Sequence, residues 1–251
     1  MEASFIITFA SPRLDNLHQT IRFLRRNHSD VIKDCELITV CQDFCELPSV
    51  DGFGKHFHYD LEVECMQLPK LTNYGVDHCN CKKVVVLESD RILPPGYFAA
   101  VLKQLKTGVQ ISTKHVLKLA RSYTDEEIID NKLEYTEENR TEDNQIGTRN
   151  MWSGNTAFMK VDFETAGKMD EGYIGYGWAD SDMTNTMKTV GIRSIFRSET
   201  ELHLWHPSLT YGKGNQDQMF LENGFRFCRK WHEALPEWFR KEVAARGKTI
   251  I

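Results

Sequence analysis

Two carboxylates stand at the end of the most hydrophobic run in this sequence. Residues 83–87 (KVVVL) predict a buried strand, and Glu88 and Asp90 follow it at positions i and i+2. That spacing places both side chains on one face of the strand end. Ligands of α/β sheets bind beyond the carboxyl ends of the strands, and two oxygen donors there suit Mg²⁺ or Mn²⁺ holding a diphosphate. The alternative is a pair of solvent-facing acids at the start of a loop.

A second pair of acids precedes another predicted helix. Asp180 and Asp182 follow two glycines and Trp178, and the helix is expected over residues 183–190. One interpretation makes an acid of this pair a general base, with the indole as a platform for the apolar face of a sugar. The other is structural, because aspartates in a first helical turn cap the backbone amides. Both interpretations fit the pattern.

Two histidines form the third group of candidate residues. His203 and His206 are three positions apart, so on an ideal strand they would point to opposite faces. They converge on one ion only if the chain turns between them, which a strand end before Pro207 permits. Together with Asp90 they would make a mixed oxygen and nitrogen site, which favours Mn²⁺ over Mg²⁺. A purely structural histidine pair is the alternative.

The first hundred residues contain the elements that must position these side chains. Apolar runs at residues 4–9 and 36–41 predict strands, in addition to the run at 83–87. Between and after them, helical patterns are expected at about 14–26, 71–79 and 97–105. This alternation predicts a parallel sheet covered on both faces, hence the α/β class.

Composition excludes several classes of protein. The 251 residues are 41% hydrophobic and 27% charged with a net charge of −5, which excludes disorder and gives no general field for nucleic acid. No apolar run approaches the roughly 20 residues of a membrane span, and the first residues do not resemble a signal peptide. Seven cysteines cannot all pair within one chain, so we expect reduced thiols and a cytoplasmic location, with a luminal fragment as the alternative.

The second half of the chain is charged unevenly. Residues 121–143 are acidic and predict a solvated helix and loop, or alternatively a lid or acceptor loop. Residues 226–251 are basic and carry Trp231 and Trp238, through which this tail is expected to dock. No stretch rich in Pro, Gly or Ser separates independent units, so residues 1–251 are expected to form a single domain.

Taken in order, these segments resemble the GT-A glycosyltransferases, especially inverting enzymes of the β-1,4-galactosyltransferase type (family 7) and bacterial or viral relatives of family 2. The likeness covers roughly residues 4–220 and depends on the joint order of motifs that are weak singly. Its parts are Phe9 to Arg13, Asn73-Tyr74-Gly75, Glu88-Ser89-Asp90 as the DXD metal motif, Ser153 to Lys160, Asp162-Phe163, Gly167 to Glu171, Gly177-Trp178, Asp180 to Asp182, and His203 to His206.

The resemblance implies a GT-A fold, with a Rossmann-like central mixed and mostly parallel sheet flanked by helices. It implies a nucleotide-sugar-binding half at 1–112, an acceptor and metal half at 113–225 and a helical tail at 226–251. It also implies transfer of a sugar from a nucleotide-diphosphate sugar, with a UDP-sugar favoured, to a glycan or other hydroxyl acceptor. The cofactor is expected to be Mn²⁺ or Mg²⁺.

Individual roles are implied by the same resemblance. Asp180 is expected to be the catalytic base. The expected metal ligands are Asp90, His203 and His206; the nucleotide contacts are Arg13, Asp43, Asn73 and Glu88; and the acceptor or sugar contacts are Gly154, Trp178 and Asp182.

Departures from the family pattern leave some choices open. Glu88 replaces the usual first aspartate of the metal motif, and Ala179 alone separates Trp178 from Asp180, so Asp180 and Asp182 both stay candidates for the base. A nucleotidyltransferase is the first alternative, although residues 9–13 lack the glycine-rich loop of that class. A non-catalytic carbohydrate-binding protein is the second. The acidic middle disfavours a nucleic acid acceptor, whereas the basic tail permits one.

Overall fold

The computed structural model describes residues 1–42, 54–59, 66–130, 141–143, 151–152, 154–175, 177–206, 213–232, 237 and 239–241. Asp43, which we predicted to lie near a nucleotide, and Trp238, which we predicted to dock the tail, fall outside these residues. In the described ranges no helix is long and apolar enough to cross a membrane.

One mixed sheet runs through the described part of the chain, with strand order β3-β2-β1-β4-β8-β6-β9-β5 and with β7 paired to β6. Neighbours among the first four strands are parallel, as the alternating pattern predicts, and β6 and β9 also run parallel. Strand β8 pairs antiparallel with β4 and β6 and joins the two parallel groups. The strands are β1 (Ser4–Phe9), β2 (Glu36–Cys41), β3 (Lys55–His58), β4 (Lys83–Glu88), β5 (Arg91–Ile92), β6 (Val109–Lys118), β7 (Thr141–Asp143), β8 (Asn155–Met159) and β9 (Arg193–His203).

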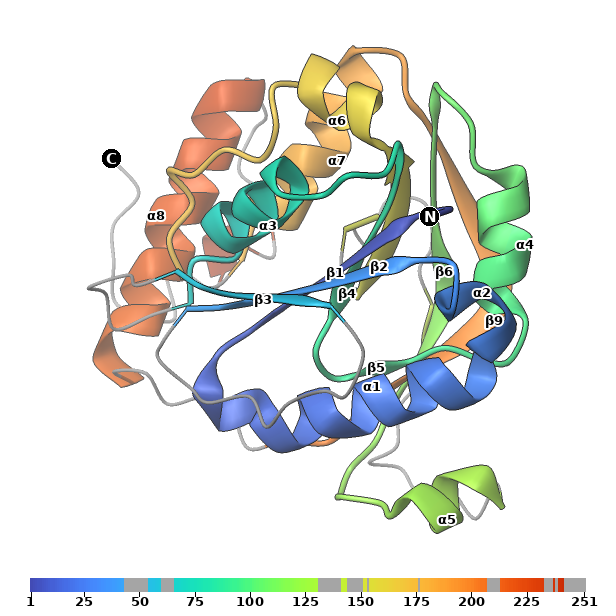
Figure 1. The fold of residues 1–251 in the computed structure, drawn as a ribbon. Coiled ribbons are helices and arrows are strands. Elements are labelled where there is room, and N and C mark those ends of the chain that lie inside the picture. Colours follow the sequence, from blue (N-terminus) through green and yellow to red (C-terminus); the bar gives the residue numbers. More distant parts are fainter. Residues whose placement is uncertain are drawn as a thin grey trace.

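Helices cover both faces of this sheet (Figure 1). Every residue of β1 is buried, because its alternate side chains enter two different cores. Phe5 and Ile7 pack in the core that includes α1 and α4, whereas Ile6 packs in the core that includes α3, α6 and α7. The helices are α1 (Leu14–Asn27), α2 (Ser29–Ile32), α3 (Leu68–Asp77), α4 (Tyr97–Gln104), α5 (Asp125–Ile129), α6 (Lys160–Thr165), α7 (Ala179–Thr189) and α8 (Lys213–Trp231), with a short 3-10 turn η1 (Ser11–Arg13).

Helix α1 follows from its sequence pattern. Leu17, Ile21 and Leu24 recur at helical spacing and are buried against the sheet. Asp15 in its first turn and Arg25 and Arg26 in its last turn complement the helix dipole. The helix therefore lies along one face of the sheet, beginning just beyond the carboxyl end of β1 (Figure 1).

The last described helix, α8, docks on α7 through polar as well as aromatic contacts. Lys230 and the Trp231 indole both donate to Asp182 of α7, at 2.7 and 2.8 Å. Docking through Trp231 is thus observed as predicted. Helix α8 begins at Lys213, so the predicted boundary at residue 226 falls inside it.

Candidate metal centre and active site

Strand pairing brings the predicted metal ligands together from two distant parts of the chain. Asp90 follows β4 and immediately precedes β5, whose Arg91 is the antiparallel partner of His203 at the end of β9. The backbone amide of Leu204 donates to the carbonyl of Asp90 at 2.8 Å. This bond joins the residue that follows β9 to Asp90. Because β9 ends at His203, the strand alternation does not continue to His206, and both imidazoles lie near Asp90.

Asp90, His203 and His206 form a compact cluster of donor atoms. The Nε2 atoms of His203 and His206 lie 3.5 and 3.3 Å from Oδ2 of Asp90, and 3.1 Å from each other. One donor atom from each residue lies within 4.8 Å of the other two. One carboxylate and two imidazoles on one side of an ion would leave its remaining positions for ligand oxygens. This donor set fits Mn²⁺ better than Mg²⁺, which prefers oxygen alone.

The charge of Asp90 is fixed by its surroundings. Burial alone would raise the pKa of this carboxyl, but the hydrogen bond from His203 and the positive charges of Arg91 and Arg13 outweigh burial and lower the pKa to about 2. The Arg13 guanidinium, just after β1, lies 3.9 Å from Oδ2. Asp90 is therefore an ionised carboxylate at neutral pH, as a cation ligand must be.

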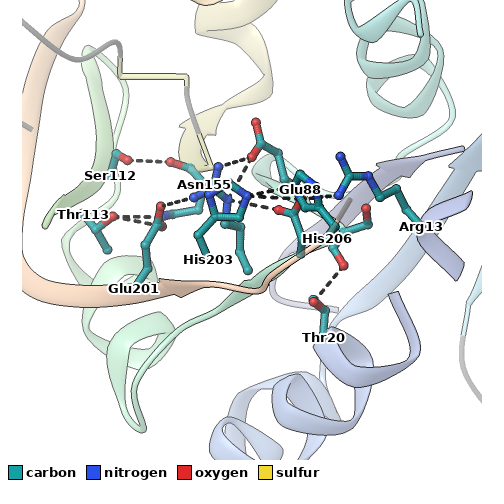
Figure 2. Close-up of polar contacts among 12 residues, drawn as sticks. Arg13, Thr20, Glu88, Ser112, Thr113, Asn155, Glu201, His203 and His206 are labelled. Carbon is teal, nitrogen blue, oxygen red and sulfur yellow. Dashed lines mark hydrogen bonds and ion pairs between the residues drawn. The ribbon is translucent and has the colours of Figure 1, made fainter. Parts of the chain in front are cut away.

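A buried ionic network adjoins the cluster (Figure 2). Arg91, only 4% exposed in its side chain, donates to Glu88, with its Nε at 2.8 Å, and contacts Asp90 at 3.2 Å. On its other side it meets the fully buried Glu201 at 3.3 Å. Glu201 also accepts from Thr113 at 3.0 Å and from Asn155. The three carboxylates thus take their positions from a single guanidinium.

Sequence reasoning missed Arg91, Glu201, Thr113 and Asn155. For Glu201 one signal was available, because it stands two residues before His203 on the same strand and shares its face. Arg91 directly follows Asp90, but its contact with Glu201 spans 110 residues, and the contacts of Thr113 with Asn155 and Glu201 span 42 and 88 residues, so no local pattern marks them.

Helix α1 holds both ligand-bearing segments by their carbonyls. Thr20 donates to the carbonyl of Ser89 at 2.9 Å, and Asn16, one turn earlier, donates to the carbonyl of Trp205 at 3.2 Å. The first bond holds the segment of Asp90 and the second holds the segment of His206. Both segments therefore share one rigid support, which limits their relative movement.

Gly154 has a structural reason for being glycine. Its φ of +98° lies in the region that L side chains rarely adopt, and a Cβ there would collide with the carboxylate of Glu201 and crowd Arg91. Its carbonyl accepts from the amide of Glu88 at 2.8 Å, so the residue before β8 is tied directly to the end of β4. A role for Gly154 in sugar binding remains a prediction.

The acids and the indole near α7 lie in different environments. Asp180, in the first turn of α7, is partly buried, and its carbonyl accepts from Thr184. Asp182 is 2% exposed, and its carboxylate accepts from Tyr173, Lys230 and Trp231. Asp182 therefore anchors α8 to α7, and of the two acids only Asp180 is a partly exposed residue.

Trp178 caps α7 in a left-handed conformation, with φ of +72°. Its ring packs among Phe220, Phe227 and Phe239, with centroids 5.1 to 5.9 Å away. The strained backbone is held by this aromatic cluster. A role of Trp178 as a platform for a sugar remains a prediction. The structure shows that the Trp178 ring packs against α8.

Asn73 lies on α3. Its amide donates to the carbonyl of Met169 and to Glu171, at 3.0 and 2.9 Å, and its oxygen accepts from the Met169 amide at 3.0 Å. The side chain is 5% exposed and joins α3 to the segment after α6. Among the described residues that we predicted to contact a nucleotide, the fold brings Arg13 and Glu88 beside Asp90.

No protein-family profile and no curated protein sequence matches the chain. Solved structures do match. The structure of GalNAc-T7 with UDP, GalNAc and Mn²⁺ superposes with a TM-score of 0.67 at 14% identity, covering 98% of this chain and 50% of that one. The chain thus spans about half the length of that structure.

Two further structures match over the same share of this chain. The mannosyltransferase PcManGT from Pyrobaculum calidifontis, in complex with GDP-Man and Mn²⁺, has a TM-score of 0.55 at 13% identity, with 68% of its own length covered. S. aureus TarS 1–349, in complex with UDP-GlcNAc, has a TM-score of 0.56 at 9% identity, with 73% covered. The mixed sheet, its two helical layers and these superpositions agree with the fold expected from the motif order: the chain has the GT-A fold of the glycosyltransferases.

Proposed function

We propose that this chain is a metal-dependent glycosyltransferase that moves a sugar from a nucleotide-diphosphate sugar to an acceptor hydroxyl. The observation that carries this proposal is the cluster of Asp90, His203 and His206 at the carboxyl edge of a GT-A sheet. Two solved structures with this fold contain Mn²⁺ together with a nucleotide or nucleotide sugar. A UDP-sugar is the favoured donor, because two of the three solved structures named above contain UDP or UDP-GlcNAc.

Different residues of the site would bind different parts of the donor. Asp90, His203 and His206 would hold Mn²⁺, which when bound neutralises charge on the departing diphosphate. Arg13 is 12% exposed and lies 3.9 Å from Asp90, so its guanidinium is placed to donate to a phosphate oxygen. Glu88 is held by Arg91 and keeps 28% of its side chain exposed, as a contact to donor hydroxyls requires.

Asp180 is proposed as the base that removes the proton of the acceptor hydroxyl. Asp182 already accepts from three donors and is buried, whereas Asp180 is partly exposed at the start of α7. A single base acting on the face opposite the leaving diphosphate gives direct displacement at the anomeric carbon, and hence inversion.

The described cysteines carry free thiols, which supports a reducing, cytoplasmic setting for the reaction.

The test is donor turnover by the purified chain. UDP-, GDP- and TDP-sugars are incubated with Mn²⁺, with and without glycan acceptors, and release of the nucleoside diphosphate is measured. We expect release by the wild type, a loss of at least about 100-fold in Asp90→Asn, and a similar loss in Asp180→Asn. The donor should still bind to the Asp180→Asn variant. The matched control is Asp34→Asn, which changes an exposed acid and should turn over the donor as the wild type does.

Three outcomes would contradict the proposal. Full turnover by Asp180→Asn would remove this residue from the role of base. Binding of a nucleotide sugar without release in any acceptor mixture would favour a non-catalytic carbohydrate-binding protein, and release of pyrophosphate from a nucleoside triphosphate and a sugar phosphate would favour a nucleotidyltransferase.

A further inference from the structure

A groove of about 840 Å³ lies beside the cluster of Asp90, His203 and His206, between α1 and residues 122–126, which include the start of α5. Pro12, Leu204 and Trp205 also line it. Pro12 directly precedes Arg13, and Trp205 directly precedes His206, so one end of the groove adjoins the cluster. Its volume lies within the range of about 300–1,000 Å³ that is usual for small-molecule sites. None of the roles proposed above uses this groove.

The two walls of the groove are fastened to each other. Gln19 of α1 donates to the carbonyl of Tyr123 at 3.0 Å and to Asp125 at 2.8 Å. Arg22, one turn further along α1, donates to Asp125 at 2.6 Å. The Thr124 side chain and Glu127 form a capping box that fixes the start of α5. The groove is therefore formed before any ligand arrives, which lowers the entropic cost of binding.

Trp205 gives the groove an apolar surface. Its side chain is 41% exposed, although it is one of the largest apolar side chains in the protein. An indole that faces a groove loses contact with water when a flat apolar surface covers it, and this burial is favourable. A pyranose ring has such a surface, because its axial C–H groups form a weakly polar face.

The remaining lining is polar and carries three acids against one arginine. Asp15 and Glu126 are exposed carboxylates, and Asp125 is already paired with Arg22. Asn16 and His18 add further polar groups. Carboxylates repel phosphates, so this lining disfavours a nucleotide or nucleic acid. They accept hydrogen bonds well, and a ligand rich in hydroxyl groups supplies the donors.

We propose that this groove binds a neutral saccharide chain, with one ring stacked on Trp205 and its hydroxyls donating to Asp15 and Glu126. The site goes beyond the transfer reaction proposed above and does not depend on it, since binding needs neither the donor nor the metal. The saccharide is held beside the metal cluster by groups that take no part in the chemistry.

The experiment is a binding titration of the full chain with neutral probes. Gluco-, manno- and N-acetylglucosamine hexasaccharides are titrated by calorimetry and by saturation-transfer NMR, without Mn²⁺ or nucleotide. We expect at least one probe to bind, Trp205→Ala to weaken it by about tenfold or more, and Asp15→Asn with Glu126→Gln to weaken it by about threefold or more. Val161→Ala, which removes another exposed apolar side chain, should bind as the wild type does.

Two further measurements separate the groove from the donor site and from misfolding. Asp90→Asn and saturating UDP with Mn²⁺ should leave saccharide affinity within about twofold, because the groove does not include the metal ligands. Trp205→Phe should retain binding within about threefold, since a ring face is preserved. Failure of every probe to bind, unchanged affinity in Trp205→Ala, or loss of saccharide binding on addition of UDP and Mn²⁺ would overturn the proposal.

Discussion

Replacing Glu201 by alanine should destabilise the fold strongly, because its carboxylate is the buried end of the network that adjoins the metal cluster. Glu201 is fully buried and accepts from Arg91, Thr113 and Asn155. Removing one partner of a buried ion pair costs about 3–5 kcal/mol. Arg91 keeps its contacts with Glu88 and Asp90, so the cost of losing its ion pair with Glu201 should lie near the lower end of that range. Thr113 and Asn155 also lose their acceptor, which adds about 1 kcal/mol for each. We therefore expect a loss of about 4–5 kcal/mol.

The conservative variant Glu201→Gln should cost much less. A glutamine keeps the shape and one acceptor oxygen, and Arg91 retains its two other carboxylates, so we expect a loss of about 1–2 kcal/mol. The matched control is Glu199→Ala on the same strand, where a partly exposed pair with Arg197 is worth about 1 kcal/mol or less.

Urea unfolding, followed by circular dichroism at constant pH and salt, gives the three free energies of unfolding. Equal losses in Glu201→Ala and Glu201→Gln would refute the argument from charge and hydrogen bonding. A loss in Glu201→Ala no larger than that in Glu199→Ala would refute the structural role altogether.

Three further predictions concern other parts of the fold. His28 is buried, and burial lowers its pKa to about 4, so stability should fall as pH drops from 6.5 toward 4, by up to about 3 kcal/mol, and urea midpoints of His28→Leu should lack this slope. Asp182→Ala should release α8, raising protease cleavage between α7 and α8 and costing about 2–4 kcal/mol by thermal unfolding; unchanged proteolysis would contradict its anchoring role. Gly154→Ala should lower the unfolding midpoint and weaken Mn²⁺ binding in paramagnetic resonance titrations, because a Cβ there displaces Glu201 and Arg91; a variant with wild-type stability would disprove the close contact.

The sequence predicted the first half of the fold well because its signals are local. Strands β1 and β2 occupy the predicted residues 4–9 and 36–41, since continuous apolar runs are what a sheet covered on both faces requires. Helix α1 followed from apolar spacing and terminal charges. Strand β9, by contrast, reads RSIFRSETELH and is mostly half-exposed, so no apolar pattern marks its length, although it carries Glu201 and His203.

For the site, residue types and motif order were enough to name Asp90, His203 and His206 as one group. Their convergence was conditional on a strand end that the sequence only permitted; β9 ends at His203, and the pairing of Arg91 with His203 brings Asp90 beside it. The guanidinium that holds three carboxylates, the support from α1 and the burial of Asp182 all depend on contacts between distant segments. Local patterns report which face of an element is buried, whereas these polar contacts depend on which elements become neighbours, and only the tertiary structure decides that.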